Sequence, residues 1–445
     1  MERKIHNYLK EWKKSPVRKP LLIKGTRQVG KTYSVLTFGK KEYENVAYVN
    51  LESSYESKRI FEGDLNAKTI IRGLSSISGE SISEGDTLIV LDEVQRSERA
   101  LTSLKYLQEE SPEHHIIATG SLLGMALDRN EYSFPVGKVD MKTMHPMDME
   151  EFLWATGNKG LSDMISESFD RMVPVPLHGK AMELYRTYLA IGGMPEAISE
   201  FLRTKDHNFA VSAQNRLGES YLADVAKYSP PAETIRTMDV WSSLPSQLAR
   251  ENKKFQYGSV KPGARSKDYS GSIAWLEAAG VVSVCKRVEE GKLPLNIYED
   301  GSSFKVYIVD TGLLSSRYGL PMKRILHSDI SGELKGAITE NYVMQALVSN
   351  GIRPYYWSSS GKAELDFVFQ NAEGDIIPVE VKSSDKVRSK SMNLFVSKYE
   401  VPYAIRLSSK NMGFDNGIMS VPLYAAFCID NKNTGPKIAD KGELL

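Results

Sequence analysis

The feature that most constrains the fold of this 445-residue chain is a strand–loop–helix segment near its amino terminus. Residues 19–38 read KPLLIKGTRQVGKTYSVLTF. The apolar run Leu21–Ile23 predicts a short strand, and the residues that follow Lys31 have a helical pattern. The segment from Gly25 to Thr32 matches G-x-x-x-x-G-K-[ST] in the setting that this pattern requires. We therefore predict a phosphate-binding loop.

The residue types in this loop suit the chemistry of a nucleoside triphosphate. Gly25 and Gly30 let the backbone curl so that successive N–H groups face a phosphate, at the positive end of the following helix. Lys31 reaches the β- and γ-phosphates as a catalytic point charge, and the Thr32 hydroxyl ligates Mg²⁺. The residues that we expect to bind the nucleotide here are Gly25, Thr26, Arg27, Gln28, Val29, Gly30, Lys31 and Thr32.

A second segment, GDTLIVLDEVQ at residues 85–95, supports hydrolysis of the nucleotide. Its apolar run Leu88–Leu91 predicts a buried parallel strand with acids at its carboxyl edge. Asp92 would bind the nucleotide's Mg²⁺ through water, and Glu93 would polarise the attacking water as the catalytic base. Acids after a strand are common, but together with the upstream loop this pair indicates triphosphate hydrolysis.

Two more apolar runs, residues 45–53 and 114–123, predict strands of the same sheet, separated by helical segments. This alternation indicates a doubly wound, parallel α/β domain over residues 1–155. Thr119 follows one of these strands, where P-loop ATPases often keep a polar residue that senses the γ-phosphate. A plain turn explains the Thr119-Gly-Ser sequence equally well.

The segments GTRQVGKT, LDEVQR, ATGSLL and IGGMPEA together resemble a prokaryotic AAA-type P-loop ATPase family whose members carry a C-terminal domain of unknown function. The resemblance covers nearly the whole chain in matching order and implies ATP and Mg²⁺ as cofactors. One departure is Lys138, which stands where such proteins commonly have an arginine. Arg96 and Arg129 are alternative candidates for an arginine finger that acts in trans, although an ordinary surface arginine explains each of them better.

The middle of the chain has a helical pattern over residues 156–237. Gly192-Gly193 and Pro195 force a turn between two helices, and Pro230-Pro231 ends another. Such a segment fits a lid or connector that reports the nucleotide state, or a simple packing scaffold.

Residues 238–325 have a different pattern, which predicts two helices followed by two strands. This order suggests a winged helix-turn-helix. Lys261, Arg265 and Lys267 would lie at the start of its second helix, where a recognition helix contacts nucleic acid. Internal packing is the alternative, because winged helices also serve as docking modules inside larger proteins.

The last third, residues 326–445, places three acids and a lysine in a recognisable order. Glu340 lies in an amphipathic helix, Asp366 lies on a strand, and Glu380 and Lys382 lie two residues apart on the next strand, after a hairpin with Gly374 at its tip. This array resembles the PD-(D/E)xK core of restriction-endonuclease-like enzymes. The resemblance implies catalytic roles for all four residues, with Asp366 and Glu380 as Mg²⁺ ligands. An inactive module that only binds DNA or protein is the alternative.

Composition sets limits on these readings. The net charge of +1 gives no global signal for nucleic acid, so any DNA contact must be local. Two cysteines are too few for a disulfide framework, and no apolar run approaches 18 residues, which predicts a cytoplasmic protein without a membrane segment. The sequence indicates neither an oligomeric state nor a preferred base beyond the ATP that the resemblance implies.

Three hypotheses follow. In the first, ATP hydrolysis gates a nuclease-like domain that binds or cleaves DNA. In the second, the protein is an ATP-dependent switch whose C-terminal modules only bind DNA or a protein partner. A small-molecule kinase is disfavoured, because nothing downstream resembles an acceptor site and the Asp92-Glu93 pair suits attack by water.

Overall fold

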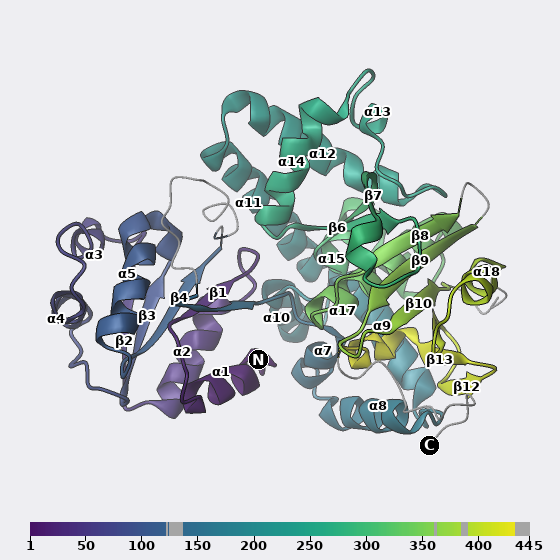
Figure 1. Ribbon diagram of the computed structural model, residues 1–445. Coiled ribbons are helices and arrows are strands. Elements are labelled where there is room, and N and C mark those ends of the chain that lie inside the picture. Colours follow the sequence, from purple (N-terminus) through teal and green to yellow (C-terminus); the bar gives the residue numbers. More distant parts are fainter. Residues whose placement is uncertain (122, 124–136, 360–362, 384–389, 432–445) are drawn as a thin grey trace. The chain divides into compact units, whose positions relative to one another are not determined.

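The computed structural model describes residues 1–121, 123, 137–359, 363–383 and 390–431 (Figure 1). The chain forms two compact units. The N-terminal unit comprises Glu2–His145 together with Ala278–Gly280, and the C-terminal unit comprises Pro146–Glu277 and Val281–Leu445. The four-domain division with boundaries at 155, 237 and 325 stays a prediction.

The N-terminal unit is built on a five-stranded sheet in the order β2-β3-β4-β1-β5, with every pair parallel. Its carboxyl edge therefore gathers the loops that follow β1, β3 and β4, which is where ligands bind in open α/β sheets. The strands are β1 (Leu21–Lys24), β2 (Asn45–Asn50), β3 (Thr87–Asp92), β4 (His115–Gly120) and β5 (Asp140–Thr143).

Helices cover both faces of this sheet (Figure 1). Alternate strand residues point to opposite faces, so Leu21 and Ile23 pack with α1 and α2 while Leu22 packs with α4 and α5. The helices are α1 (Ile5–Lys14), α2 (Lys31–Glu42), α3 (Tyr55–Arg59), α4 (Ala67–Ser78), the 3₁₀ turn η1 (Val94–Arg96) and α5 (Glu98–Glu110). This is the doubly wound arrangement that the sequence predicts. The fifth strand was not expected, because Asp140–Thr143 is short and largely polar.

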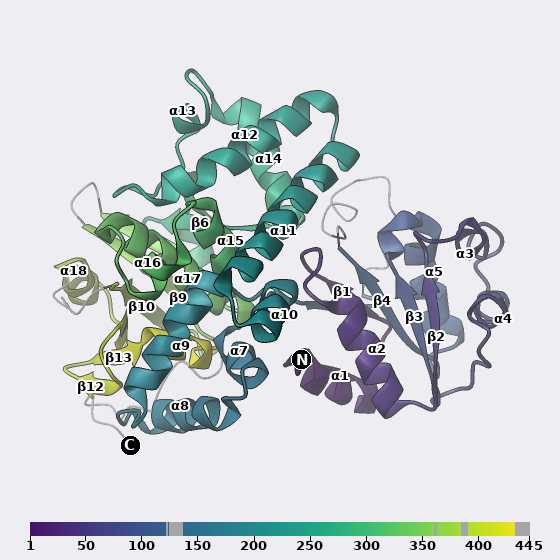
Figure 2. The same cartoon turned by 180° about the vertical axis from the view of Figure 1, so that it is seen from behind.

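The C-terminal unit begins with a succession of helices, which confirms the helical pattern of the middle segment. Figure 2 shows α9 and α11 of this group from behind. The turn between α9 and α10 lies at Gly192-Gly193, as predicted. The helices are α7 (Met149–Ala155), α8 (Lys159–Arg171), α9 (His178–Ile191), α10 (Pro195–Thr204), α11 (His207–Tyr228), α12 (Pro231–Leu248), α13 (Tyr257–Val260) and α14 (Ser266–Ala278).

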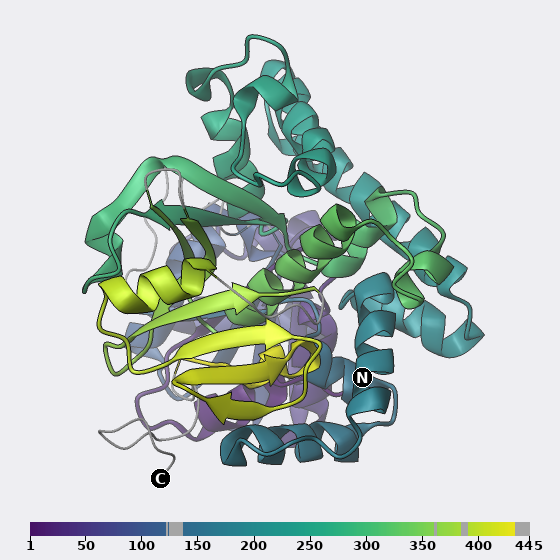
Figure 3. The same cartoon turned by 90° about the vertical axis from the view of Figure 1, so that its right-hand side faces the viewer.

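An eight-stranded mixed sheet follows, in the order β12-β13-β11-β10-β9-β8-β6-β7, and Figure 3 looks towards its C-terminal strands. The strands are β6 (Val282–Val288), β7 (Glu299–Ile308), β8 (Tyr355–Ser359), β9 (Ala363–Gln370), β10 (Ile376–Val381), β11 (Ala404–Ser408), β12 (Gly413–Asp415) and β13 (Ile418–Pro422). The remaining helices are α15 (Thr311–Arg317), α16 (Met322–Leu326), α17 (Gly332–Ser349), α18 (Lys390–Lys398), η2 (Leu295–Tyr298) and η3 (Leu423–Cys428).

The two strands expected for a wing pair with each other, but they do not stand apart from the last third of the chain. β6 pairs antiparallel with β7 on one edge and parallel with β8 on the other. A strand has two hydrogen-bonding edges, and an apolar strand pattern does not say what each edge pairs with. The two strands predicted for a wing therefore belong to the same eight-stranded sheet as the strands of the last third of the chain.

The Gly192-Gly193 turn is held by a buried carboxylate. The N–H of Gly193 donates to Asp310 at 2.6 Å, and the N–H of Leu313 donates to the same side chain at 3.0 Å. A Cβ at residue 193 would lie 1.9 Å from the Met147 carbonyl oxygen, so only glycine fits there. The IGGMPEA segment therefore has a structural explanation: it joins α9, α10 and the start of α15.

Among the described residues, no helix combines the length and the apolar character needed to cross a bilayer.

Candidate functional site

The loop between β1 and α2 has the backbone shape of a phosphate cradle. Gly25 has φ +150° and Gly30 has φ +93°, conformations that favour glycine, and Gln28 between them has φ +63°. A Cβ on Gly25 would lie 2.1 Å from the Met144 carbonyl oxygen. Lys31 begins α2, so the loop leads directly into a helix amino terminus.

The Lys31 side chain lies buried over this loop, with 7% of its surface exposed. Its ammonium donates to the carbonyl oxygens of Gly25 at 2.8 Å and Thr26 at 2.9 Å. Burial lowers the pKa of Lys31 to about 8, against the opposing effect of Glu93 and Asp92. The predicted phosphate lysine is therefore placed on the loop, in a setting that penalises its charge unless an anion is close.

Asp92, at the end of β3, accepts hydrogen bonds from several other elements of the site. The Thr32 hydroxyl donates to its two carboxylate oxygens at 3.2 and 3.1 Å. The Thr119 hydroxyl, from the neighbouring strand β4, donates to the same carboxylate. The structure thus brings together three predicted residues from three different elements, and gives Thr119 a partner that a plain turn would not need.

Glu93 follows Asp92 in the left-handed region, with φ +53°. This conformation is uncommon for a residue with a side chain and is typical of functional sites. The Gln95 amide donates to the Glu93 carboxylate, and the Ser121 hydroxyl lies 3.4 Å from it. Glu93 is half-buried, so its carboxylate is oriented by neighbours and still accessible to water.

Two residues of this site were missed by sequence reasoning. The Tyr48 hydroxyl donates to Asp92 at 2.9 Å from the end of β2. Arg3 is buried, and its guanidinium donates to the Val29 carbonyl at 2.8 Å and to the His145 carbonyl at 2.7 Å. Tyr48 carried a usable signal, since a polar side chain near the carboxyl end of a parallel strand faces the same edge as Asp92. Arg3 carried none.

The donor set at Thr32 and Asp92 fits Mg²⁺. Both side chains present oxygen atoms, the ligands that this hard cation prefers, and they lie within hydrogen-bond distance of each other at the sheet edge. The other loop residues differ in exposure: Thr26 and Val29 are buried, whereas Arg27 and Gln28 are exposed.

The candidates for an arginine finger have different settings. Arg96 pairs with Glu52 within the N-terminal unit, and Lys138, in place of the family's arginine, pairs with Glu109 at 2.9 Å. Arg129 lies outside the described residues.

The acids and lysine of the last third occupy the predicted elements. Glu340 lies on α17, Asp366 on β9, and Glu380 on β10, with Lys382 immediately after that strand. β9 and β10 form the predicted antiparallel hairpin, and Gly374 at its tip has φ +95°. The Val381 N–H donates to Asp366 at 2.7 Å, while Lys382 pairs with Glu380.

Glu340 has partners that the sequence did not indicate. Lys305 on β7 lies 3.2 Å from Glu340 and 2.7 Å from Glu364, and Lys253 forms a second ion pair with Glu340. The Tyr307 hydroxyl also donates to Glu340. The signal for Lys305 was a lysine inside the apolar run FKVYI, which is rarely buried unless paired.

The pKa values of Glu340 and Asp366 are shifted in opposite directions. Burial by itself would raise the pKa of Glu340, but Lys253, Lys305 and the Tyr307 hydroxyl outweigh it and lower the value to about 2. Burial, and then the charge of Glu340, raise the pKa of Asp366 to about 7. Among the described residues, no group of three or more His, Cys, Asp or Glu side chains could hold a metal ion. The cluster of Glu340, Asp366, Glu380, Lys253 and Lys305 is called the acid–lysine cluster below.

The three basic residues predicted to contact nucleic acid lie where expected. Lys261 and Arg265 precede α14, and Lys267 is in its first turn. All three side chains are exposed. They lie near the amino-terminal end of that helix, whose first turn also contains Asp268.

Residues 17–153 match the family model described as an AAA domain. The match covers most of the N-terminal unit and supports an AAA-type P-loop domain that binds and hydrolyses ATP. Two further family models match later parts of the chain. Each is described as a domain of unknown function, DUF8612 over residues 182–324 and DUF4143 over residues 335–426. A comparison with curated proteins found no match.

Several solved structures resemble the chain distantly. A Walker-type ATPase of Pyrococcus abyssi is 16% identical, with a TM-score of 0.45, covering 71% of this chain and 95% of that chain. The ORC2 protein of Aeropyrum pernix is 13% identical, with a TM-score of 0.34 and coverage of 75% and 92%. The RuvB Holliday junction branch migration motor of Thermotoga maritima is 12% identical, with a TM-score of 0.28 and coverage of 64% and 89%.

Proposed function

We propose that this protein hydrolyses ATP in its N-terminal unit and uses the nucleotide state to control a C-terminal unit that binds DNA. The observation that carries the first part is the convergence of the Thr32 and Thr119 hydroxyls on Asp92, beside the buried Lys31. A carboxylate ringed by hydroxyl donors and close to a desolvated lysine suits a triphosphate with its cation.

Each residue has a distinct part in the proposed reaction. Lys31 and the loop N–H groups bind the phosphates, and the helix amino terminus adds its partial positive charge. Thr32 and Asp92 would hold Mg²⁺, which when bound supplies positive charge to the β- and γ-phosphates. Glu93 accepts a proton from the attacking water, and the Gln95 amide and Ser121 hydroxyl orient its carboxylate.

The decisive experiment replaces Lys31 with alanine in the full chain. We expect ATP turnover to fall by about 100-fold or more, because a preorganised charge on the transferred phosphate is removed. Lys40→Ala is the matched control, since Lys40 is exposed on the same helix. Equal ATPase rates for Lys31→Ala and wild type would overturn the proposal.

The second part of the proposal concerns DNA. Lys261, Arg265 and Lys267 are exposed together, and such a surface binds phosphates through counterion release. Replacing all three with glutamine should reduce the slope of log affinity against log salt by about 2 to 3, measured on duplex DNA. Glutamine at the exposed Lys14, Lys40 and Lys68 is the control of equal charge. An unchanged slope in the first triple variant would exclude this surface.

For the part of the C-terminal unit that carries the acid–lysine cluster, we propose that it binds DNA or a protein partner and does not cleave nucleic acid. Lys253 and Lys305 already neutralise Glu340, so the acids are balanced by the protein's own cations. The competing function is a nuclease in which Asp366 and Glu380 bind Mg²⁺ and Lys382 orients the attacking water. Incubating DNA with protein and Mg²⁺ or Mn²⁺ separates the two. Cleavage that is lost in the Asp366→Ala, Glu380→Ala double variant would favour the nuclease.

A further inference from the structure

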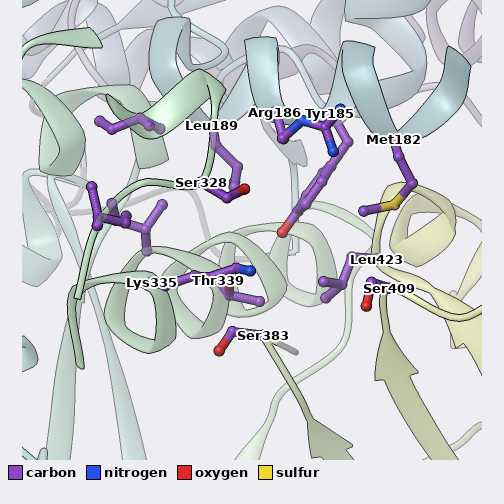
Figure 4. A pocket seen from close by; sticks show the side chains of 13 residues that line it. Met182, Tyr185, Arg186, Leu189, Ser328, Lys335, Thr339, Ser383, Ser409 and Leu423 are labelled. Atoms are coloured by element: carbon purple, nitrogen blue, oxygen red, sulfur yellow. The ribbon is translucent and has the colours of Figure 1, made fainter. Parts of the chain in front are cut away.

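A cavity in the C-terminal unit is lined by residues that belong to neither of the two sites described above. It has a volume of about 270 Å³, near the lower end of ligand-binding pockets. One wall is a face of α9, where Met182, Tyr185, Arg186 and Leu189 recur at helical spacing. Figure 4 shows these side chains opposite Lys335 and Thr339 of α17.

The cavity is lined by two cations and no acid. Arg186 and Lys335 both contribute to its wall, and no Asp or Glu among the described residues does so. Neither cation forms an ion pair within the described part of the chain, whereas Arg203, Arg216 and Lys253 of the same unit each pair with a glutamate. Both side chains are partly buried. Two unneutralised positive charges facing one small space attract an anion.

A buried hydroxyl is directed into the same space. Tyr185 is 2% exposed, and its hydroxyl points from α9 toward α17 in Figure 4. Thr339 is its polar neighbour, but no hydrogen bond of ordinary geometry joins the Tyr185 oxygen to any atom of the described residues. A buried hydroxyl without a good partner is costly, so this group is available to donate to a ligand.

The remaining residues that line the cavity are of two kinds, hydroxyl-bearing and apolar. Ser328 and Ser383 bring further hydroxyl-bearing residues. Leu189, Ile338 and Leu423 supply an apolar side. The cavity therefore combines a cationic, hydroxyl-rich part with an apolar part.

We propose that this cavity binds a nucleotide through its terminal phosphate. Arg186 and Lys335 neutralise the phosphate, the Tyr185 hydroxyl donates to it, and the apolar part accommodates the sugar and base. An arginine and a lysine together suit this group, because the guanidinium presents planar paired donors and the ammonium acts as a point charge. The site contains no residue of the phosphate-binding loop, so the proposal does not depend on ATP hydrolysis.

The test uses full-length protein carrying Lys31→Ala, so that nucleotide binding at the N-terminal loop does not contribute. The four ribonucleoside 5′-monophosphates are titrated calorimetrically, each beside its nucleoside. We expect at least one monophosphate to bind about 100-fold more tightly than its nucleoside. Arg186→Gln and Lys335→Gln should each weaken that binding by about 10- to 100-fold, as expected for hydrogen bonds to a charged group.

Two further variants separate contact from folding. Tyr185→Phe removes only the hydroxyl and keeps the ring, which packs edge-on against Tyr342 with the ring centroids 5.0 Å apart. We therefore expect this variant to bind the monophosphate about 10-fold more weakly, with an unchanged melting temperature. Lys323→Gln is the charge-matched control, because Lys323 is exposed on α16 and does not line the cavity. The proposal is overturned if no monophosphate binds, if nucleosides bind as well, or if Arg186→Gln and Lys335→Gln leave the affinity unchanged.

The phosphate could belong to a free nucleotide or to the end of a nucleic-acid strand. A 5′-phosphorylated oligodeoxynucleotide is therefore compared with the same oligonucleotide bearing a 5′-hydroxyl. Tighter binding of the phosphorylated strand, lost in Arg186→Gln, assigns the cavity to strand ends. Binding of the monophosphate without this difference assigns it to a free nucleotide.

Discussion

The N-terminal loop site and the C-terminal acid–lysine cluster are built from the same residue types and arranged in opposite ways. In the N-terminal unit, Lys31 contacts backbone carbonyls, and Asp92 is held by hydroxyl groups. In the C-terminal unit, Lys305 contacts two glutamates directly. The first arrangement keeps its lysine and its carboxylate for external partners. The second satisfies its charges within the protein.

This difference shows why charged residues in a motif do not by themselves establish a reaction. A desolvated lysine that contacts only dipoles gains most from an incoming anion. A buried ion pair is already neutral, and removing one partner leaves an uncompensated charge. The same side-chain types therefore contact backbone carbonyls in one unit and are paired with opposite charges in the other.

The largest effect that separates the two sites should come from replacing each lysine with methionine. Lys305→Met leaves Glu340 with one lysine fewer in a buried setting, so we expect the free energy of unfolding to fall by about 3 to 5 kcal/mol. Lys31→Met removes a charge that burial penalises, so we expect a change of about 1 kcal/mol or less. Urea unfolding followed by circular dichroism measures both.

Lys286→Met is the control for this comparison. Lys286 pairs with Glu299 at 2.9 Å but is 42% exposed, and exposed pairs contribute about 0 to 1 kcal/mol. Equal losses for Lys305→Met and Lys286→Met would contradict the structural role of Lys305.

A smaller effect should distinguish the two tyrosines that donate to the acids. Tyr307→Phe removes a buried hydrogen bond to Glu340, which we expect to cost about 1.5 kcal/mol of stability. Tyr48→Phe removes the bond to Asp92 at a half-exposed position and should cost about 0.5 kcal/mol, with a several-fold lower ATPase rate. A loss of ATPase activity in Tyr307→Phe, with Tyr48→Phe unaffected, would reverse the comparison.

A further effect is a pH dependence of stability that arises from the C-terminal unit. The pKa of Asp366 in the folded protein, about 7, lies above its unfolded value, so the folded state retains a proton that the unfolded state has lost. The free energy of unfolding should therefore decrease as pH rises from about 4 to about 7. Because Asp366 is partly exposed, we expect a decrease on the order of 1 kcal/mol.

Asp366→Asn should remove this dependence, as measured by urea unfolding at several pH values. Glu340 acts in a separate window, because its lowered pKa makes its contribution to stability disappear only as pH falls from about 4.5 to about 2. A wild-type stability that rises between pH 4 and 7 would refute the assignment to Asp366.

The phosphate-binding loop shows how much a contiguous motif predicts. Gly25, Gly30, Lys31 and Thr32 are close in sequence, and their roles depend on local backbone shape, which glycine spacing reveals. Asp92 was also predicted, because acids are expected at the carboxyl edge of a buried parallel strand. Thr119 was predicted by likeness to P-loop ATPases, with a plain turn as the alternative. Tyr48 lies at the same edge and could have been found in this way, whereas Arg3 reaches the loop from the segment before α1, which carries no motif.

The C-terminal unit shows where such prediction ends. The hairpin of β9 and β10 was predicted from its turn and its alternation, and the structure confirms it. Lys253 and Lys305 were not predicted as partners of Glu340, because they lie 87 and 35 residues away along the chain. Likewise, the pairing of β6 with β8 could not be read from either strand.

The sequence by itself determined the nucleotide loop, the parallel sheet that carries it, and the order of helices and strands that follows. These depend on local geometry and on hydrophobic periodicity, which neighbouring residues encode. The tertiary structure alone decided that Glu340 is neutralised by lysines and that Arg186 and Lys335 line one cavity without an acid. Both outcomes depend on which distant charges share a buried space, and the energy of a charge depends on that environment more than on its neighbours in sequence.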